Sequence, residues 1–414
     1  MSEKTINKVP NVPNLRFIYY DALEYIELEK FVINDKNSFA GGPFGSNLKT
    51  CDYTDTGIPI IQLSNITEDY LNFDNRLVFT SVAKANELKT NNAFPGDMII
   101  AKMMPAGRAC LATTQFNRYV LGSDAIRVAL DTNKCNPYFI REQINSPTIK
   151  KIISSKTAGS TRQRIGIPEL KKLKLFVPSV EEQNKIGYFL KILDFRIETQ
   201  SKIIKEYKTL KNAIINQLIF NNSNLDEKMK LSRFATLRNG YAFKSSDYID
   251  NGKYNILTIA NVKGDRYIDA SECNKIIEIP KDIQNHQILK INDILISLTG
   301  NVGRVSLVNA DNCLLNQRVG VLSIIDENYR EYIFQVISSK QFETKMILKG
   351  QGAAQKNIGN DDVESFYIPF SKKSLYINKL VNLFVSFDKK IAIEEQILND
   401  YQSQKKYLLN NMFI

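Results

Sequence analysis

The sequence contains no tryptophan and only one histidine, His286, among its 414 residues. Zinc sites built from histidine and cysteine, and Ser-His-Asp or Cys-His hydrolytic sites, therefore have almost no residues to draw on. We interpret His286 as a surface or turn residue. The five cysteines are widely scattered, odd in number and never arranged as a C-x-x-C pair, so we expect reduced and mostly buried thiols.

Long hydrophobic runs are missing as well. No apolar stretch approaches the ~18 residues that span a bilayer, and the first residues, 1–11, are polar. We therefore expect a cytoplasmic protein with no membrane partner. Basic residues exceed acidic ones by 11, and this charge indicates a polyanionic partner. Charge alone does not distinguish DNA from RNA or a membrane surface.

What the sequence does contain is a long heptad pattern from Ile186 to Ile219. Apolar residues recur in steps of four and three, with gaps only at Gln200 and Lys211. Between Gly187 and Ile219 the stretch contains no proline and no further glycine. The pattern predicts a single helix of roughly 50 Å at about 1.5 Å per residue.

The same heptad pattern returns 194 residues later, with polar gaps at Glu394 and Lys405. Every apolar position of the first helix has an apolar counterpart in the second. We predict that the helices pack through these positions, each residue against its counterpart: Ile186, Leu190, Leu193 and Ile197 in the first helix, and Leu380, Phe384, Phe387 and Ile391 in the second.

The globular segments repeat too. Residues 95–108 align with 291–304 at an offset of 196, and residues 159–166 align with 352–359 at an offset of 193. Short apolar runs between Gly, Asn, Asp and Pro are typical of sheets with turns, and a helix is expected near 138–154. We predict an α+β chain in four parts: a first domain (1–178), a first helical region (179–222), a second domain (223–370) and a second helical region (371–414).

Chain connectivity favours an antiparallel pair of long helices. The second domain starts where the first helix ends and must finish where the second helix begins. A parallel pair would separate these points by the whole helix, roughly 50 Å. We therefore predict an antiparallel coiled coil between two similar mixed α/β domains, a pseudo-two-fold repeat on one chain. Two similar basic domains at a fixed separation are suited to reading two different DNA half-sites.

The most basic stretch, residues 150–174, contains a glycine-flanked loop able to approach a DNA groove. Arginine and glutamine make bidentate contacts to base edges, whereas lysine neutralises phosphates. Two further arginines follow paired glycine turns, where a turn-capping role is equally open, and the basic stretch itself can be a solvated face. The candidate DNA-binding residues are Arg108, Lys156, Arg162, Gln163, Arg164, Arg304, Arg318, Gln355, Lys356 and Asn357.

Four motifs carry a resemblance to a known family: VPNLRF at 12–17, the repeated G/N-D strand followed by Gly-Arg, the G-x-x-x-(Q/K)-x-I-G segments, and EEQNKIGYFLKILDFRI at 181–197. With them the chain resembles the specificity subunit of type I restriction–modification systems. The resemblance implies two target-recognition domains, each reading half of a bipartite site in double-stranded DNA. It also implies that the helical regions dock two methyltransferase subunits, with endonuclease or translocase subunits as further partners.

The same resemblance implies that this chain is not an enzyme and holds no cofactor or metal, because S-adenosylmethionine, ATP and Mg²⁺ would bind partner subunits. Two departures from the family pattern stand out. The family's frequent tryptophan near the N-terminus is absent, and the EEQ signature is replaced in the second copy by SLYINKL at 374–380. The second departure puts symmetric docking of two identical partners in question.

Catalytic motifs are weak. The loop GGPFGS (41–46) lacks the lysine and spacing of a phosphate-binding loop, so we interpret it as a glycine loop before a strand. Its counterpart carries Tyr241 and Phe243, which either touch DNA or seal the core. NPYF (136–139) lacks the second proline of the amino-methyltransferase motif and is interpreted as a helix start.

Two rival functions remain open. Asp74, Glu87 and Lys89 have the spacing of a metal-dependent nuclease, although such spacings arise by chance in a charged chain. The other rival is a decoy that occupies the methyltransferase through the helices without reading DNA.

Overall fold

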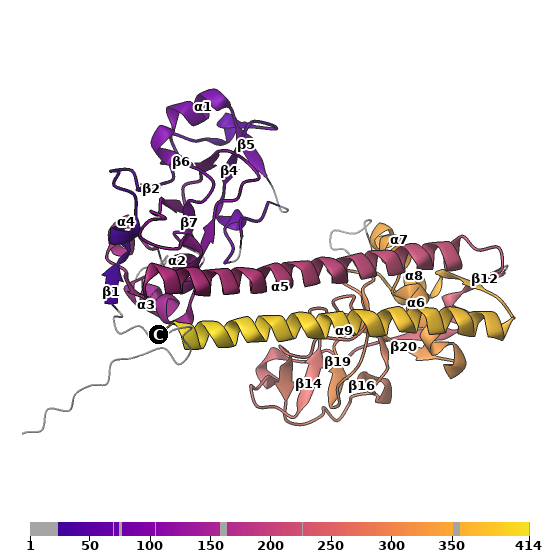
Figure 1. Ribbon diagram of the computed structural model, residues 1–414. Helices are drawn as coiled ribbons and strands as arrows, with labels where there is room; N and C mark the ends of the chain where they lie inside the picture. The colour runs from indigo at the N-terminus through magenta and orange to yellow at the C-terminus, as the bar shows by residue number, and fades with distance from the viewer. Residues whose placement is uncertain are drawn as a thin grey trace, which may run out of the picture. The chain divides into compact units, whose positions relative to one another are not determined.

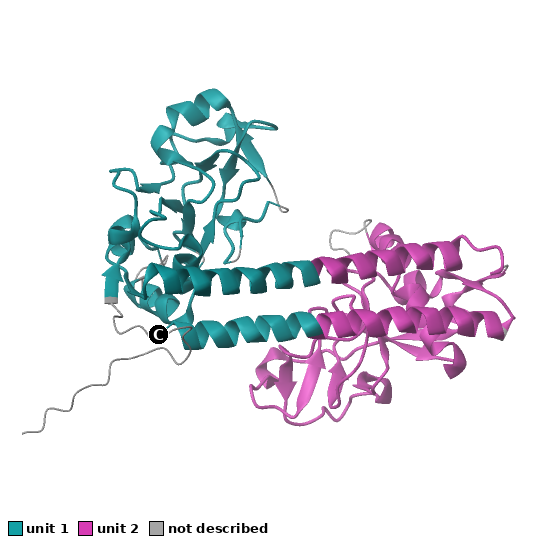
Figure 2. Cartoon of the chain, viewed as in Figure 1, with its two compact units in different colours: residues 1–200, 397–414 teal, residues 201–396 magenta. Residues whose placement is uncertain are grey.

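The computed structural model describes residues 24–68, 70–73, 77–103, 105–157, 164–225, 227–350 and 357–413 (Figure 1). The chain forms two compact units (Figure 2). The first unit contains Met1–Gln200 and Ile397–Ile414, and the second contains Ser201–Gln396. Each long helix therefore contributes one segment to each unit. In the described part of the chain, no helix combines the length and the apolar character that crossing a membrane demands.

The described residues of the first unit form three sheets. A four-stranded antiparallel sheet has the order β2-β10-β7-β8, with strands Phe39–Gly41, Ala125–Val128, Met98–Ala101 and Ala109–Leu111. A five-stranded sheet has the order β3-β5-β4-β9-β6, with strands Tyr53–Thr54, Val78–Thr80, Ile58–Ile61, Tyr119–Leu121 and Asn92–Ala93. Within it only β4 and β9 run parallel. The third sheet pairs β1 (Glu24–Glu27) with β11 (Lys174–Val177).

The second unit repeats this plan. Its first sheet has the order β13-β20-β17-β18, with strands Ala235–Asn239, Val319–Ile324, Ile294–Ser297 and Val305–Leu307. Its second sheet has the order β15-β14-β19-β16, with strands Asn274–Ile276, Tyr254–Leu257, Cys313–Leu315 and Ile288–Leu289. A third sheet pairs β12 (Glu227–Lys230) with β21 (Tyr367–Phe370). The predicted repeat of two similar α+β domains is confirmed.

The central strand β7 is apolar throughout because both of its faces are buried. Side chains of a strand alternate between its two faces. In β7, Met98 and Ile100 join the core around α2 and the long helices, whereas Ile99 and Ala101 join the core beneath the second sheet. In the second unit, β17 divides its side chains between two cores in the same way.

The duplicated G/N-D motif forms the turn that precedes each central strand. Gly96 and Asn292 have φ values of +90° and +71°, a region that glycine and asparagine tolerate best. The aspartate that follows accepts a hydrogen bond at 2.8 Å from the backbone three residues earlier, from Phe94 to Asp97 and from Lys290 to Asp293. Burial raises the pKa of both carboxyl groups, and these backbone hydrogen bonds oppose the shift.

Short helices cover the first sheet of each unit. In the first unit these are α2 (Pro137–Ile144), α3 (Pro147–Thr157) and α4 (Ile167–Lys171), and a further helix, α1 (Val82–Glu87), lies by the second sheet. The second unit has α6 (Arg330–Ile337), α7 (Lys340–Gly350) and α8 (Asn360–Glu364). Asn136 caps α2 through Phe139 N–H at 3.0 Å, with Pro137 in the first turn, so the interpretation of NPYF as a helix start is confirmed.

The single helix expected near 138–154 is wrong, because the structure has two helices there. Proline disfavours the helical conformation for the residue before it, and Pro147 follows Ser146 at the break. Asn145 bonds the backbone of Ala109 on β8 instead of prolonging the helix. The second unit breaks between α6 and α7 without a proline, so the interruption belongs to the repeated fold.

The long helices are α5 (Val180–Ile215), extended by a π-helical turn over Asn216–Phe220, and α9 (Ser374–Met412). The first helix begins before the heptad pattern at Ile186 because the Ser179 hydroxyl accepts a hydrogen bond from the Glu182 N–H at 3.3 Å. A serine followed by a glutamate three residues later is a known helix-capping sequence, so this start could have been predicted from the sequence.

The two helices run antiparallel within each unit. In the first unit, Ile186 and Leu190, near the start of α5, share a core with Met412 and Phe413 at the end of the chain. In the second unit, Leu380 and Phe384, near the start of α9, share a core with Ile215 and Ile219 at the end of α5. The predicted antiparallel arrangement is confirmed, but the predicted packing of each residue on its counterpart is wrong. Antiparallel helices bring the start of one against the end of the other, so counterparts lie in separate units.

The remaining predicted seam residues differ in exposure. Leu193 and Ile391 are buried, whereas Ile197 and Phe387 are half-buried.

The lysines that interrupt the heptad pattern form ion pairs across the helix pair. In the first unit, Lys405 of α9 lies 2.6 Å from Asp194 of α5. In the second unit, Lys211 of α5 lies 2.5 Å from Asp388 of α9. The two pairs are equivalent under the 194-residue repeat (194 + 194 = 388 and 211 + 194 = 405). Each lysine that interrupts the heptad pattern thus has an aspartate partner on the opposite helix.

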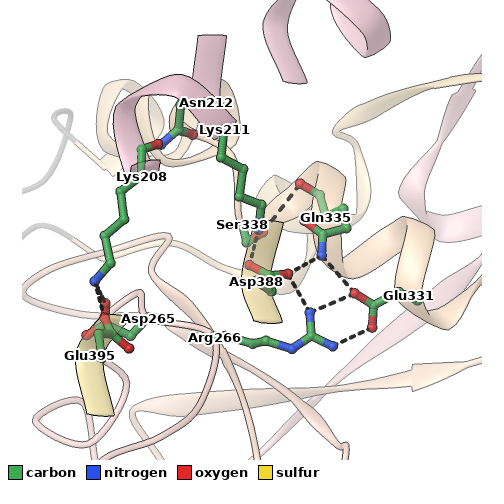
Figure 3. A network of polar contacts seen from close by, with 10 residues as sticks. All are labelled: Lys208, Lys211, Asn212, Asp265, Arg266, Glu331, Gln335, Ser338, Asp388 and Glu395. Atoms are coloured by element: carbon green, nitrogen blue, oxygen red, sulfur yellow. Dashed lines mark hydrogen bonds and ion pairs between the residues drawn. The ribbon is translucent and has the colours of Figure 1, made fainter. Parts of the chain in front are cut away.

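Asp388 is the centre of a larger buried network (Figure 3). Besides Lys211 it accepts hydrogen bonds from Arg266 at 2.7 Å and from Gln335 at 2.6 Å. Glu331 in turn contacts Arg266 at 2.7 and 2.8 Å. Burial lowers the pKa of Lys211, and the charge of Asp388 opposes that shift. The network satisfies several polar groups that would be costly to bury alone.

The cysteines give a direct test of the core. All five are free; Cys110, Cys135 and Cys313 are buried and Cys51 is exposed. Burial raises the pKa of Cys110 and Cys135 to about 12 and that of Cys313 to about 11. Because the thiolate is the reactive form, we expect a maleimide at pH 8 to label these three at least about a hundredfold more slowly than Cys51.

Peptide mapping by mass spectrometry after a short labelling time measures these rates. The unfolded chain in urea is the control, in which all five cysteines should react alike. Rapid labelling of Cys110 in the folded chain would contradict the described core.

Candidate nucleic-acid interface

The paired glycine turns connect β7 to β8 and β17 to β18. Gly107 and Gly303 have φ values of +87° and +79°, and a Cβ at either would lie 2.6 Å from a side chain of the helix beneath, Ile153 of α3 or Met346 of α7. Each glycine N–H also donates to the last residue of the preceding strand, at 2.8 Å and 2.9 Å. Glycine is therefore required at both turns, and both turns are held against a helix.

The arginines that follow these turns, Arg108 and Arg304, lie against the neighbouring elements of their own units. Arg108 is half-buried, and its Nε is buried with no hydrogen-bond partner in the described part of the chain. Arg304 has its Nε 3.8 Å from Glu343 of α7, and its backbone N–H donates to Ser297 Oγ at 3.0 Å.

Three segments meet beside the turn of the first unit. Lys102, directly after β7, donates its backbone N–H to Asp124 O at 2.8 Å and accepts from Ile165 N–H at 2.9 Å. Its ammonium group donates to Ser123 O at 2.7 Å. Arg164 reaches the Asp124 carboxylate at 3.2 Å while 53% of its side chain stays exposed. We call Lys102, Asp124 and Arg164 the first corner.

The second unit has the same backbone corner with other side chains. Leu298 N–H donates to Arg318 O at 3.0 Å, and Leu298 O accepts from Ile358 N–H at 3.0 Å. Leu298 is buried, whereas Arg318 and Asn357 are exposed. We call Leu298, Arg318 and Asn357 the second corner. Of the predicted DNA-binding residues, Arg164 lies at the first corner, and Arg318 and Asn357 lie at the second.

Lys102 and Asp124 were missed by the sequence reasoning. Lys102 lies in the duplicated segment 95–108, but its counterpart is a leucine, so the repeat alone gave no signal. Burial lowers the pKa of the Lys102 ammonium group, the nearby Asp124 opposes that shift, and Arg164 adds to it. The first corner is therefore a compact cationic site with one carboxylate.

The other predicted residues are less informative. Lys156 is exposed near the end of α3. Arg162, Gln163, Gln355 and Lys356 lie outside the described residues, on segments that lead directly to Arg164 and Asn357.

The glycine loop at 41–46 is explained by backbone packing. A Cβ on Gly42 would lie 1.7 Å from Gly122 O, and a Cβ on Gly240, in the second copy, would lie 2.2 Å from Asn316 O. The phenylalanines on these loops differ. Phe243 packs against a small core around Ile256, whereas Phe44 is 84% exposed. This geometry supports the structural interpretation of the loop over a phosphate-binding one.

The residues considered for catalysis do not assemble into a described site. His286 lies in a 3-10 turn, with Nε2 at 3.0 Å from Asn239 O, as expected of a turn residue. Asp74 lies outside the described residues, and Glu87 pairs with Lys84 at 3.0 Å. Among the residues that the structure describes, no group of three or more His, Cys, Asp or Glu side chains could hold a metal ion.

Comparisons with known proteins agree with this fold. The family model of the type I restriction modification DNA specificity domain matches twice, over residues 43–209 and 226–400. A curated protein of Methanocaldococcus jannaschii, described as a type I restriction enzyme MjaX specificity subunit, is 21% identical over 377 residues, with 86% of each chain covered.

Solved structures show the same fold. The S subunit of a type I restriction–modification system from M. genitalium matches with a TM-score of 0.57 and 15% identity, covering 97% of this chain and 99% of that one. A chain from a study of complex assembly and conformational transition of the type I restriction–modification system matches with a TM-score of 0.52 and 12% identity, covering 96% and 99%. Because two matches of the family model span most of the sequence, this chain belongs to the family of type I restriction–modification specificity subunits, which are non-catalytic DNA-recognition subunits.

Proposed function

We propose that this chain reads an asymmetric, bipartite site in double-stranded DNA, one half with each globular domain, and that partner subunits supply the chemistry. The observation that supports this most is the pair of corners. One backbone arrangement occurs twice and carries different polar side chains, as two heads reading different half-sites would require. In this proposal residues 1–178 and 223–370 are the target-recognition domains, and residues 179–222 and 371–414 are the helical regions.

The candidate DNA contacts divide by chemistry. Arg162, Gln163, Arg164, Arg318, Gln355 and Asn357 carry the fork-shaped groups that suit base edges, whereas Lys156 and Lys356 suit phosphates. Arg108 and Arg304 remain candidates for either role. No cofactor is assigned to this chain. Methyl donor, ATP and Mg²⁺ belong to the methyltransferase and to any endonuclease subunit.

The methyltransferase subunits are proposed to dock on the outer faces of the long helices. Tyr188, Ile192 and Phe195 of α5 are 69%, 38% and 68% exposed, at spacings of four and three that place them on one face. We call these three residues the α5 stripe. Their counterparts on α9 are Asn382, Ser386 and Lys389, all exposed and polar. Two copies of one partner would thus meet different surfaces, apolar on α5 and polar on α9.

A genome-wide map of methylated bases, in the host with and without the gene, tests the proposal. We expect deletion to remove one gapped, two-part methylated motif. An unchanged map in a host that expresses the protein would contradict the proposal.

The salt dependence of DNA binding distinguishes readout from a decoy that only occupies the methyltransferase. We expect Lys156→Ala, in the complex with its methyltransferase, to reduce the slope of log K against log salt by roughly 0.9, the value for one phosphate contact. Lys185→Ala is the matched control, since this lysine pairs with Glu181 at 2.8 Å on α5. A slope that stays unchanged in Lys156→Ala would favour the decoy.

A further inference from the structure

Backbone hydrogen bonds at the two corners allow a residue-by-residue comparison, and it agrees with the offsets of the sequence repeat. Backbone hydrogen bonds make Lys102 equivalent to Leu298 and Asp124 equivalent to Arg318. Ile165 N–H donates to Lys102 O, and Ile358 N–H donates to Leu298 O. The residues directly before these isoleucines, Arg164 and Asn357, are therefore equivalent as well. At all three positions the backbone is shared and the side chain differs in charge or polarity.

At the first corner a single exposed guanidinium group is held by a carboxylate. Arg164 contacts Asp124 at 3.2 Å, and Asp124 also accepts from Ser123 Oγ at 3.2 Å. The Arg164 Nε also donates to Met103 Sδ at 3.3 Å, so the guanidinium group is held in one orientation, which suits a directional contact to a base edge better than a diffuse charge contact to a phosphate. It is well placed to present its fork to the O6 and N7 atoms of a guanine.

At the second corner the guanidinium and amide groups come from other positions. Arg318 is exposed on the turn between β19 and β20, and its backbone N–H donates to Asn316 Oδ1 at 3.3 Å. Asn357 is exposed and forms an isolated bridge with Thr299. An asparagine carries no charge for a phosphate, but it pairs with the N6 and N7 atoms of adenine. Leu298 is buried and takes no part.

We propose that these corner residues determine the specificity of the two heads: Arg164, braced by Asp124, reads a guanine in one half-site, and Arg318 and Asn357 read a guanine and an adenine in the other. This inference rests on the proposed function. It adds the residues that read bases, the class of base that each reads, and the positioning role of Asp124.

The test is a methylation map of the host carrying variants of the full-length chain together with its methyltransferase. Arg164→Ala should relax one G·C position in one half of the motif, by roughly 5- to 150-fold in discrimination, and leave the other half unchanged. Asn357→Ala should relax one A·T position in the other half only. Arg164→Lys keeps the charge but loses the fork, so it should relax the same G·C position while the salt slope of binding stays unchanged.

Lys156→Ala is the matched control, because loss of a phosphate contact should weaken methylation at all sites without changing the motif. Uniform weakening by Arg164→Ala, with the motif intact, would overturn the inference and leave the proposed function standing. Relaxation in the wrong half, or at no position, would overturn it as well. Failure of the proposed function looks different, because the unaltered chain would then specify no two-part motif at all.

Discussion

Replacing Asp388 with leucine is expected to lower the free energy of unfolding of the second unit by roughly 3–5 kcal/mol. The side chain is 7% exposed and accepts contacts from Lys211, Arg266 and Gln335. Arg266 keeps Glu331 as a partner. Lys211, whose side chain is 12% exposed, loses the one carboxylate that lies within ion-pair distance of it among the described residues. Leaving a buried ammonium group without a counter-charge is what makes the substitution costly.

An exposed ion pair on the same helices provides the matched control. Lys208 lies 2.7 Å from Asp265 and 2.8 Å from Glu395, but all three side chains are 40% exposed or more (Figure 3). Pairs of this kind contribute about 0–1 kcal/mol, so Lys208→Ala should have little effect. Because the chain has no tryptophan, urea unfolding is best followed by circular dichroism at 222 nm, and hydrogen exchange of peptides within 201–396 reports on the second unit.

A second substitution separates the loss of a partner from the loss of packing. Lys211→Met removes the charge that Asp388→Leu leaves unpaired, so the double variant should recover most of the lost stability, since well-packed apolar residues often replace a buried ion pair without cost. If the double variant instead loses as much free energy of unfolding as the two single variants together, Lys211 and Asp388 are not coupled.

The same pairs explain why the two similar helices should adopt the antiparallel arrangement. If the helices paired in parallel through the repeat, Asp194 would meet Asp388 and Lys211 would meet Lys405. The antiparallel register instead gives each aspartate a lysine of the opposite helix within its own unit. Like-charge contacts in the alternative arrangement act against it, which is a role that buried polar residues play in coiled coils.

The sequence was sufficient wherever a local pattern had a single physical solution. The repeat, the two long helices and their antiparallel direction followed from periodicity and connectivity. Equivalent asparagines even make equivalent contacts. Asn65 accepts from Gln62 N–H at 2.8 Å and donates to Asn72 O at 2.9 Å, and Asn261 bonds Thr258 N–H and Asp269 O, both at 2.8 Å.

The sequence was insufficient where contacts join distant segments. The corner residues Lys102, Asp124 and Arg164 come from three segments, and nothing in the local pattern brings them together. The EEQ signature is a similar case. Gln183 is buried because it bonds Asn136 N–H at 3.0 Å and Pro178 O at 2.9 Å, which fastens α5 to α2. In the second copy the equivalent position holds Ile377, which is buried in the apolar core.

The exposed faces of the two long helices differ as well, and this difference predicts a large effect on partner docking. We expect Tyr188→Lys with Phe195→Lys to reduce the number of methyltransferase subunits bound per chain from two to one. Both aromatic residues are more than two-thirds exposed on the α5 stripe, so their replacement should not disturb the core. Buried aromatic anchors typically carry about 2 kcal/mol or more each at an interface, so affinity at this site should fall on the order of a hundredfold or more.

The matched control is Asn382→Lys on α9. Because the counterpart of Phe195 is already Lys389, this single substitution gives α9 lysines at both equivalent positions. This face is already polar, so the first methyltransferase should remain bound at the α5 stripe, and any loss should concern the other copy. Native mass spectrometry of the assembled complex counts the subunits, and titration at low concentration gives the two affinities separately. Retention of both copies by the Tyr188→Lys, Phe195→Lys variant would mean that the stripe is not a docking surface. If instead one copy is lost from that variant alone, the two docking sites are unequal, and assembly should proceed through a complex with a single methyltransferase bound at α5.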